Sequence, residues 1–503
     1  MNDLARLAAG VMITGFDATA LDERDVQRLR RTPFAGFILF ARNVESVAQV
    51  RELTDVVRAF DDPPQLLSID QEGGRVARIR DGAEELPAMM ALGATRDPSL
   101  AVRAGEQLAF DLRRAGLSHD FAPVVDLALD PRNGAIGARA FGESPALVIE
   151  MAGAFLRGLQ RGGVAGTLKH FPGHGDTSVD SHLDLPVIDV DAATLRVRDL
   201  APFAALAPEA ASIMAAHVVA AGFDEAVPAT LSRRLLTDLL RSEWHYDGVC
   251  FTDCMQMNAV ANGIGTVKGV AAAIAAGADC AIVSHDLELA EAAAQHLASE
   301  VEAGRIPRER LHEAFERVMR LRRATPEPLA LDAPAPHPRI GREIARRAVT
   351  RIRGIAHADP TASIVVSFSG ATTEGAQGTL GGGASLASQA PALQELLAPL
   401  DPSDGDAGPL IESIAQSRRR PIVLMRRAHL IPAQARAVAA ILERFPDALV
   451  VSMREPYDCE LFPQAQHLLA AYGDNGASLG GLADVIFGDG LATGVLPVDL
   501  ARL

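Results

Sequence analysis

The sequence predicts a two-part α/β fold: a (β/α)8 TIM-like barrel followed by a smaller α/β sandwich domain. Short apolar runs alternate with longer amphipathic stretches through the first two thirds of the chain, a pattern typical of strands and helices in turn. A proline-rich stretch then interrupts the alternation, which resumes after it. With 503 residues, the chain is also too long for one hydrophobic core, so two or three domains are expected.

Eight apolar runs are the candidate strands of the barrel, and amphipathic segments lie between them. The runs cover residues 10–16, 34–40, 65–70, 119–126, 164–170, 212–217, 248–253 and 279–285. The clearest helical patterns cover residues 47–60, 99–115, 146–161 and 232–241. Eight strands separated by helices match a closed barrel. An open doubly wound sheet is the competing arrangement, but its strands would have to be shared between two cores.

Most of these runs end in an ionisable side chain. The groups are Asp70, Asp126, Lys169 with His170, His217, Asp253 and His285. Because the carboxyl ends of all strands in a barrel open on one face, these groups are predicted to converge on one pocket. Any one of them could instead be a structural hydrogen-bonding group, but their shared position favours a common site.

The composition changes over residues 325–340, which contain Pro326, Pro328, Pro334, Pro336 and Pro338. Such a segment is typical of a stiff linker. It divides the chain into a barrel domain over residues 1–324 and a C-terminal α/β sandwich domain over residues 341–503. In the second domain we expect a helix over about residues 339–349 and buried strands over residues 363–369, 421–426, 448–454, 467–472 and 483–488.

Charge and hydropathy exclude several classes of partner. The net charge of -16 argues against nucleic acid, since binding phosphates needs clustered Lys and Arg. No stretch approaches the roughly 20 apolar residues of a membrane span, so no membrane partner is expected. The N-terminus lacks a basic segment followed by an apolar run and a cleavage site. A cytoplasmic protein, monomeric or homodimeric, is therefore predicted.

The cysteines give no sign of a metal site. They are Cys250, Cys254, Cys280 and Cys459, in apolar or strand-like contexts without metal-ligand spacing. Buried, reduced thiols are the expectation.

The richest stretch of chemistry is residues 169–182 (KHFPGHGDTSVDSH). It contains one lysine, three histidines and two aspartates within fourteen residues, and its glycines and proline disfavour a helix. A loop at a strand end is a common place for catalytic groups. Asp180 could hold one imidazole nitrogen of His182, so that His182 donates and later accepts a proton.

Two rival interpretations of this stretch stay open. His174 with Asp176 is an alternative dyad with similar spacing. A zinc site built from His170, His174 and His182 is another, although no H-x-x-x-H helix frames these residues.

Asp253 ends an apolar run and is the candidate nucleophile. A partly desolvated carboxylate must stay ionised for this role, and Lys169, His170 or Arg139 could hold its pKa down. A carboxylate that forms a covalent glycosyl-enzyme is one half of retaining glycoside hydrolysis. Asp253 could also be a structural group that binds loop amides.

Residues 70–75 (DQEGGR) follow the third run and suggest a grip on a sugar. Asp70 is placed to accept two hydrogen bonds from hydroxyl groups, and the two glycines permit close backbone approach. Glu72 and Arg75 could simply pair with each other. Arg139, in residues 136–142 (IGARAFG), adds a fork-shaped cation after the fourth run.

Together, residues 70–75 (DQEGGR), 169–175 (KHFPGHG) with 180–182 (DSH), and 251–253 (FTD) resemble the β-N-acetylglucosaminidase branch of glycoside hydrolase family 3. The resemblance spans roughly residues 5–325 and extends more weakly to the family's second domain through residues 483–488 (ADVIFG) and 494–498 (GVLPV). It implies a barrel enzyme that removes terminal N-acetylglucosamine with retention, using a nucleophilic Asp and a His/Asp acid-base pair, without metal or cofactor.

The resemblance assigns roles to individual residues. Asp253 becomes the nucleophile, and His182 with Asp180 the acid-base pair. The implied sugar contacts are Asp70, Lys169, His170 and Arg139, with Arg78 and His217 as further contacts.

Four functions are therefore compared. The leading hypothesis is exo-hydrolysis of β-linked N-acetylglucosamine from peptidoglycan or muropeptide fragments, with a small carbohydrate as the partner. Phosphorolysis of the same bond is the second, because a His donor becomes neutral on losing its proton and repels phosphate less than a carboxylate does. A non-catalytic amino-sugar binding protein is the third, and a metal-dependent hydrolase the fourth.

Overall fold

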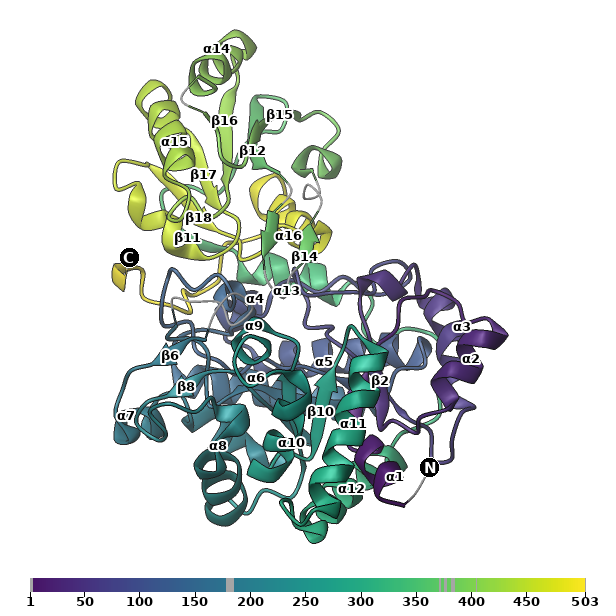
Figure 1. Ribbon diagram of the computed structural model, residues 1–503. Helices are drawn as coiled ribbons and strands as arrows, with labels where there is room; N and C mark the ends of the chain where they lie inside the picture. The colour runs from purple at the N-terminus through teal and green to yellow at the C-terminus, as the bar shows by residue number, and fades with distance from the viewer. Residues whose placement is uncertain are drawn as a thin grey trace.

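The computed structural model describes residues 3–177, 185–370, 372–374, 378–380, 385–403 and 405–502. It confirms both parts of the predicted fold: a closed barrel of eight parallel strands and a separate six-stranded sheet (Figure 1). In Figure 1 the second part, green to yellow, lies above the barrel, with α13 (Ile340–Ala348) at the boundary.

The barrel strands follow the order β1-β10-β9-β7-β5-β4-β3-β2 around the closed sheet. Their bounds are β1 (Met12–Thr14), β2 (Gly36–Leu39), β3 (Leu66–Ile69), β4 (His119–Asp120), β5 (Ala165–Phe171), β7 (Ser212–Ala215), β9 (Val249–Cys254) and β10 (Cys280–Val283). Each lies within or close to a predicted run, so the predicted strand ends do share one face. β4 is shorter than predicted, because Pro123 has no N–H to continue the ladder.

Helices surround the barrel, and three of them cover most or all of the predicted helical patterns at residues 47–60, 99–115 and 146–161. They are α1 (Asp3–Ala9), α2 (Glu23–Arg30), α3 (Val47–Arg58), α4 (Met89–Thr95), α5 (Pro98–Arg114), α6 (Pro145–Arg161), α7 (Ala192–Val197), α8 (Ala201–Leu206), α9 (Asn258–Ala261), α10 (Thr266–Ala276), α11 (Leu287–Glu302) and α12 (Arg308–Arg323). A π-helix, η5 (Arg234–Glu243), covers most of the predicted helix at residues 232–241. The short strands β6 (Val187–Ile188) and β8 (Val219–Ala220) pair with each other outside the barrel.

Short 3-10 helices complete the connections. They are η1 (Ala41–Asn43), η2 (Gly137–Arg139), η3 (Ala207–Glu209), η4 (Ala229–Leu231), η7 (Leu386–Gln389), η8 (Pro456–Leu461) and η9 (Leu500–Arg502).

A buried polar layer lies inside the barrel below the strand ends. His119 Nδ1 lies 3.0 Å from Ser68 Oγ, and His119 Nε2 lies 3.1 Å from Ser212 Oγ and 3.0 Å from Thr167 Oγ1. Burial lowers the pKa of His119 to about 3, so its imidazole is neutral. The layer therefore joins four strands through neutral hydrogen bonds and leaves the charged groups to the level above.

The C-terminal part is an α/β sandwich around one sheet in the order β11-β18-β17-β16-β12-β15. Its strands are β11 (Thr350–Arg353), β12 (Ser363–Ser369), β15 (Gln394–Pro399), β16 (Arg420–Met425), β17 (Leu449–Ser452) and β18 (His467–Ala470), and β13 (Thr372–Glu374) and β14 (Gly378–Leu380) form a separate pair. β11 runs antiparallel to β18, and the other neighbours are parallel.

Helices α14 (Ala407–Ser417) and α15 (Pro432–Arg444) cover one face of this sheet, and α16 (Gly476–Ile486) covers the other. The alternation of β16 shows this arrangement: Val423 packs in the core shared with α14 and α15, whereas Ile422 packs in the core shared with α16. A sheet buried on both faces explains why these strands are continuous apolar runs.

The predicted strand at residues 483–488 is wrong, because this segment is the end of α16 and the residues that follow it. A short apolar run does not distinguish a strand from a buried helix, and the helix begins ahead of the run at Asn475, whose side chain accepts the Ser478 amide. β11 and β15 are additions to the prediction. β11 (TRIR) alternates with charged residues, and β15 lies at the sheet edge with Leu397 72% exposed, so neither is an apolar run.

Residues 324–339, between α12 and α13, contain neither helix nor strand and lie against α3 and α5. The Leu329 carbonyl accepts from Arg51 Nη1 and the Glu327 carbonyl from Arg113 Nη2. Over the described residues, no helix has the length and apolar character that crossing a bilayer needs. All four cysteines are free, and three of them are fully buried.

Candidate active site

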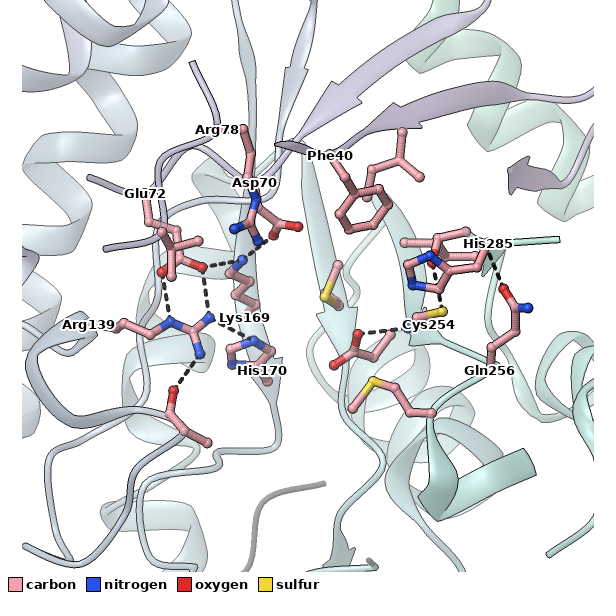
Figure 2. A pocket seen from close by; sticks show the side chains of 18 of the residues that line it. Phe40, Asp70, Glu72, Arg78, Arg139, Lys169, His170, Cys254, Gln256 and His285 are labelled. Carbon is pink, nitrogen blue, oxygen red and sulfur yellow. Dashed lines mark hydrogen bonds and ion pairs between the residues drawn. The ribbon is translucent and has the colours of Figure 1, made fainter. Parts of the chain in front are cut away.

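A cavity of about 510 Å³ opens at the carboxyl ends of the barrel strands. Two walls face each other across it (Figure 2): Asp70, Glu72, Arg78, Arg139, Lys169 and His170 lie on one side, and Phe40, Cys254, Gln256 and His285 on the other. Asp253 also lines it. The convergence predicted from the strand ends therefore holds for Asp70, Lys169, His170, Asp253 and His285.

The first wall is held by a buried group of alternating charges. Lys169 Nζ donates to Asp70 Oδ1 at 2.7 Å and contacts Glu72 Oε1 at 2.5 Å. Arg139 binds the Glu72 carboxylate through two hydrogen bonds, Nη2 to Oε1 at 2.7 Å and Nε to Oε2 at 2.8 Å. Its third nitrogen, Nη1, donates to the Ala135 carbonyl at 2.6 Å. Glu72 is thus the bridge between the two cations.

The charges in this wall fix each other's ionisation. Burial alone would raise the pKa of Glu72, but Arg139 and Lys169 outweigh it and hold that pKa far below its usual range. Burial would lower the pKa of Lys169, yet Asp70 and Glu72 raise it. Glu72, Lys169 and Arg139 therefore stay charged at neutral pH, and the wall offers fixed donors and acceptors.

His170 is oriented from behind by Asp126. His170 Nδ1 lies 2.7 Å from Asp126 Oδ2, and the same carboxylate accepts the backbone amides of His170 and His174. Burial would raise the pKa of Asp126, but His170 outweighs it and lowers that pKa. Arg139 Nη2 approaches His170 Nε2 at 3.4 Å, so the ring is held from both sides. Asp126 is a strand-end residue that acts here through His170.

The loop after β3 is shaped by Gln71. Its Oε1 accepts the amides of Arg78 (2.6 Å) and Ile79 (3.0 Å), and its Nε2 donates to the Ile79 carbonyl at 2.8 Å. Its own amide donates to Asp120 Oδ1 on β4 at 2.9 Å. Gln71 thereby folds the loop so that Asp70, on one side of it, and Arg78, on the other, both reach the cavity.

Asp253 lies at the end of β9 and is half-buried. Its Oδ1 accepts the amide of Cys254 at 2.7 Å. Cys254 Sγ in turn lies 2.9 Å from Ser284 Oγ on the neighbouring strand end, and burial raises the pKa of this thiol. Because the Cys254 thiol is neutral, Asp253 remains the candidate nucleophile at the end of β9.

The second wall is aromatic and cationic. The rings of Phe40 and His285 lie 5.2 Å apart at 32°, and Arg42 lies over Phe40 with Cζ 4.7 Å from the ring centroid. Arg42 Nη2 donates to the Ser284 carbonyl at 2.9 Å, and Gln256 Oε1 accepts the His285 amide at 2.7 Å. None of Phe40, Arg42 and Gln256 was predicted from the sequence as a site residue. Phe40 ends a predicted apolar strand and is typical of a core side chain, whereas Arg42 and Gln256 follow strands in segments typical of exposed loops.

His217 lies behind the cavity rather than in its lining. It is fully buried, with Nε2 donating to the Cys254 carbonyl at 2.9 Å and Nδ1 2.8 Å from Thr230 Oγ1. It therefore contacts the backbone that carries Asp253, and its predicted sugar contact stays a prediction.

The proposed acid-base pair, Asp180 and His182, lies outside the described residues. Of the rival dyad, Asp176 Oδ2 pairs with Arg198 Nη2 at 2.6 Å, and His174 Nδ1 lies 2.9 Å from Thr177 Oγ1. Glu72, for which sequence reasoning considered only Arg75, pairs with Arg139 and Lys169.

The glycines of the loop after β5 have a packing role. The segment that follows β4 passes so close to Gly175 that a Cβ at this glycine would lie 1.6 Å from the Leu127 carbonyl oxygen. Asn133 Nδ2 donates to the His174 carbonyl at 2.7 Å beside it. Only glycine fits this crossing, which brings the two loops of the first wall together. Across the described parts of both loops and the rest of the described chain, no cluster of three His, Cys, Asp or Glu side chains could hold a metal ion.

Comparisons with known proteins found similar sequences and structures. A family model described as the glycosyl hydrolase family 3 N-terminal domain matches residues 8–321. Over 293 residues the chain is 42% identical to the "Beta-hexosaminidase" of Pseudomonas aeruginosa (strain LESB58), covering 57% of this chain and 87% of that protein. "Beta-hexosaminidase A" of Pseudoalteromonas piscicida is 32% identical over 370 residues, covering 67% of this chain and 62% of that protein.

Solved structures show the same fold. The glycoside hydrolase family 3 β-N-acetylglucosaminidase from Paenibacillus sp. str. FPU-7 superposes with a TM-score of 0.92 at 31% identity, covering 99% of each chain. NagZ from Neisseria gonorrhoeae, in complex with N-trifluoroacetyl-D-glucosamine, has a TM-score of 0.53 at 32% identity and covers 62% of this chain and 98% of that one.

Proposed function

The chain belongs to glycoside hydrolase family 3, and on that premise we propose that it is a retaining exo-β-N-acetylglucosaminidase. The observation that carries the proposal is the cavity itself: Asp253 and the ion-paired side chains of the first wall line one space of about 510 Å³. Such a space suits one sugar ring with part of its aglycone.

The first wall supplies the grip on the non-reducing sugar in this proposal. Asp70 and Glu72 present carboxylate oxygens, and Lys169 and Arg139 present fixed N–H groups. Because these side chains are already bonded to each other, little conformational entropy is lost when a sugar replaces solvent against them. Hydroxyl groups, which both donate and accept, match such a mixed surface.

The chemistry proceeds in two displacements. In the first, a carboxylate oxygen of Asp253 bonds to the anomeric carbon while the bond from that carbon to the aglycone oxygen breaks, and that oxygen takes a proton from His182, held by Asp180. In the second, His182 takes a proton from water, whose oxygen displaces the Asp253 carboxylate. Two inversions give net retention.

We further propose muropeptide fragments as the source of the sugar, with the protein acting in the cytoplasm as a monomer or homodimer on this small carbohydrate and with no nucleic acid or membrane as partner. The support is the family resemblance of the 169–175 and 180–182 motifs and the negative charge of the chain.

The test is a panel of aryl β-glycosides with the product anomer followed by NMR. We expect turnover of the N-acetylglucosaminide with the β-anomer formed first. The Asp253→Asn variant should lower kcat by roughly 10³-fold or more, since a carboxamide cannot form the glycosyl ester. Asp238→Asn, at an exposed position on η5, is the matched control and should keep full activity.

Two results would contradict the proposal. Unchanged turnover by Asp253→Asn would remove the nucleophile, and the α-anomer as first product would remove the double displacement. Repeating the assay with inorganic phosphate tests the second candidate: a sugar 1-phosphate as the main product would make the protein a phosphorylase.

A further inference from the structure

Residues 127–143, which follow Asp126 and which we name the arginine loop, carry Arg139 into the cavity. The inner side of this loop belongs to the first wall, where Ala135, Ile136 and Arg139 line the cavity. Its outer side lies against the C-terminal domain, which appears above the barrel in Figure 1. The arginine loop therefore lies between the first wall of the cavity and the C-terminal domain.

The C-terminal domain contacts the loop at both of its ends. Tyr457 Oη donates to the Ala128 carbonyl at 3.3 Å, and this tyrosine is 2% exposed. His429 Nε2 donates to the Pro131 carbonyl at 3.1 Å. At the far end, Arg502 Nε pairs with Glu143 Oε2 at 2.7 Å. The loop backbone is thus tied to η8, to the segment after β16 and to the C-terminal segment.

A further contact, beside Arg139, comes from Glu455, which lies between β17 and η8. Its Oε1 accepts the amide of Ala138 at 3.2 Å, next to Arg139. Gly137 has a φ of +46°, and a Cβ there would lie 2.3 Å from the same oxygen, so the backbone is pressed directly against the carboxylate. Arg427 Nε lies 3.7 Å from Glu455 Oε2, and Glu455 is 7% exposed.

These contacts do not bring the second domain into the cavity itself. Every described residue that lines the cavity comes from the barrel. The domain also contacts the loop after β3, where Asn475 Nδ2 donates to the Leu86 carbonyl at 2.7 Å. The arginine loop is a direct route to the site, because Arg139 lines the cavity and its neighbour Ala138 is hydrogen-bonded to Glu455. Because Arg139 makes two hydrogen bonds to Glu72 and one to His170, a shift of the loop would move three side chains of the first wall together.

We propose that the C-terminal domain positions the sugar-binding wall by clamping the arginine loop, with Glu455 as the positioning residue for Arg139. The inference rests on the proposed function for the role of Arg139 but not for the clamp. The second domain is then part of the working site although none of its described residues lines the cavity.

The test compares Glu455→Ala with Glu455→Gln. The alanine variant leaves the Ala138 amide without its acceptor and should lower kcat/KM for the aryl N-acetylglucosaminide by about tenfold or more, because small misplacements of binding groups are costly. Glutamine keeps an oxygen at the same reach and should restore kcat/KM to within about threefold of wild type. The matched control, Asp484→Asn, removes an ion pair with Arg342 in the same domain and should leave kcat/KM unchanged.

A second readout needs no substrate. Amide hydrogen exchange of residues 127–143 should become about tenfold faster in Glu455→Ala and stay near wild type in Glu455→Gln and Asp484→Asn. Unchanged exchange in Glu455→Ala, or a full loss of activity in Glu455→Gln, would overturn the clamp. If wild type does not cleave the aryl substrate, the proposed reaction fails, but the exchange measurement still decides the clamp.

Discussion

At the scale of single residues, Glu72 is the side chain on which the first wall depends. It is 2% exposed and joins Arg139 to Lys169, two cations that would otherwise be buried side by side. Removing one partner of a buried ion pair leaves its counter-charge desolvated, which costs more than the pair itself contributes.

We expect Glu72→Gln to lower the free energy of unfolding at pH 7 by on the order of 3 kcal/mol. The depressed pKa of Glu72 also sets the pH dependence of this effect. The contribution of Glu72 to the free energy of unfolding is complete above the pKa of an unfolded glutamate, and it is lost as pH falls through the pKa of Glu72 in the folded protein. The difference between wild type and variant in urea unfolding should therefore shrink on acidification. Glu288→Gln, in an exposed pair with Arg28, should change stability by less than about 1 kcal/mol. An equal loss in both variants would contradict this account.

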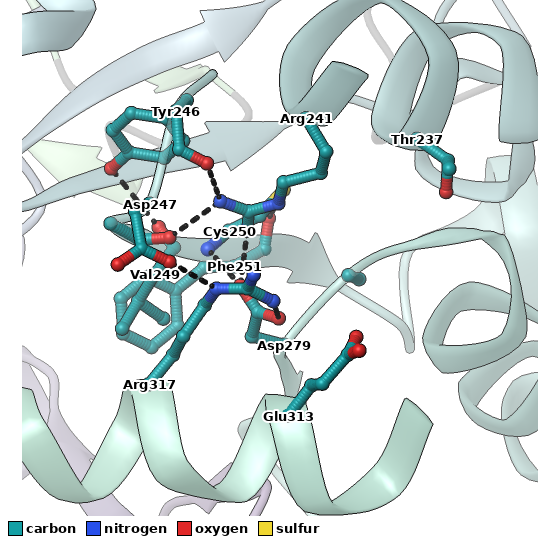
Figure 3. Close-up of polar contacts among 12 residues, drawn as sticks. Thr237, Arg241, Tyr246, Asp247, Val249, Cys250, Phe251, Asp279, Glu313 and Arg317 are labelled. Atoms are coloured by element: carbon teal, nitrogen blue, oxygen red, sulfur yellow. Dashed lines mark hydrogen bonds and ion pairs between the residues drawn. The ribbon is translucent and has the colours of Figure 1, made fainter. Parts of the chain in front are cut away.

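At the scale of elements, the opposite end of the barrel is held by a second charge cluster, shown in Figure 3. Asp279, fully buried just before β10, accepts from Arg241 of η5, from Arg310 (2.6 Å) and Arg317 (3.2 Å) of α12, and from the Cys250 amide of β9 at 3.0 Å. One carboxylate thus joins two helices and two strands at the face away from the cavity, where stability rather than catalysis is expected.

Asp279→Asn should therefore destabilise the barrel by roughly 3 kcal/mol while kcat/KM measured below the unfolding transition stays within about twofold. Asp247→Asn is the matched control, since Asp247 also pairs with Arg317 but is 72% exposed, and it should cost less than about 1 kcal/mol. Thermal unfolding of the three proteins, with kcat/KM at a common temperature, measures both effects. A large loss of activity without a loss of stability would contradict the structural role.

The same scale shows what the sequence could predict. Asp70, Lys169, His170 and Asp253 stand at strand ends, so the barrel alone brings them together once its strands are recognised. Arg139 lies far from the end of β4, and its place depends on Glu72, a tertiary pairing with no local signal.

Phe40, Arg42 and Glu455 were harder still to recognise from the sequence. Phe40 and Arg42 form a wall through contacts with His285, which lies at the opposite end of the barrel sequence. Glu455 has an effect only because the second domain docks on the arginine loop. In the second domain the central strands were predictable as apolar runs, whereas β11 and β15 at the two edges were not, because edge strands need not be apolar.

At the scale of the whole molecule, the docking of the two domains includes a titratable group. His429 Nδ1 lies 2.6 Å from Asp458 Oδ1 while Nε2 donates to the Pro131 carbonyl. Both nitrogens face acceptors, which only the imidazolium satisfies. Burial would lower the pKa of His429, but Asp458 and Glu455 outweigh it and raise that pKa. Because this pKa is raised, the contribution of His429 to the stability of the folded protein is complete below the pKa of an unfolded histidine. It is lost as pH rises through the pKa of His429 in the folded protein.

We expect the difference in Tm between wild type and His429→Gln to be largest below the pKa of an unfolded histidine, about 6.5, and to shrink as pH rises above it. Calorimetric scans across that range check it, with His312→Gln, at an exposed position of α12, as control for the loss of a histidine. A Tm difference that stays constant or grows with pH would show that the docking contact does not need the imidazolium.

The close packing at Gly175 has a consequence for how substitutions in this motif are interpreted. Within the Lys-His-Phe-Pro-Gly-His-Gly motif, the carbonyl oxygen of Leu127 leaves no room for a Cβ at Gly175, so this position is constrained by packing. A saturation screen would score Gly175 as harshly as a catalytic position. To separate a packing defect from a catalytic one, the amount of folded protein and the catalytic turnover must both be measured for each Gly175 variant.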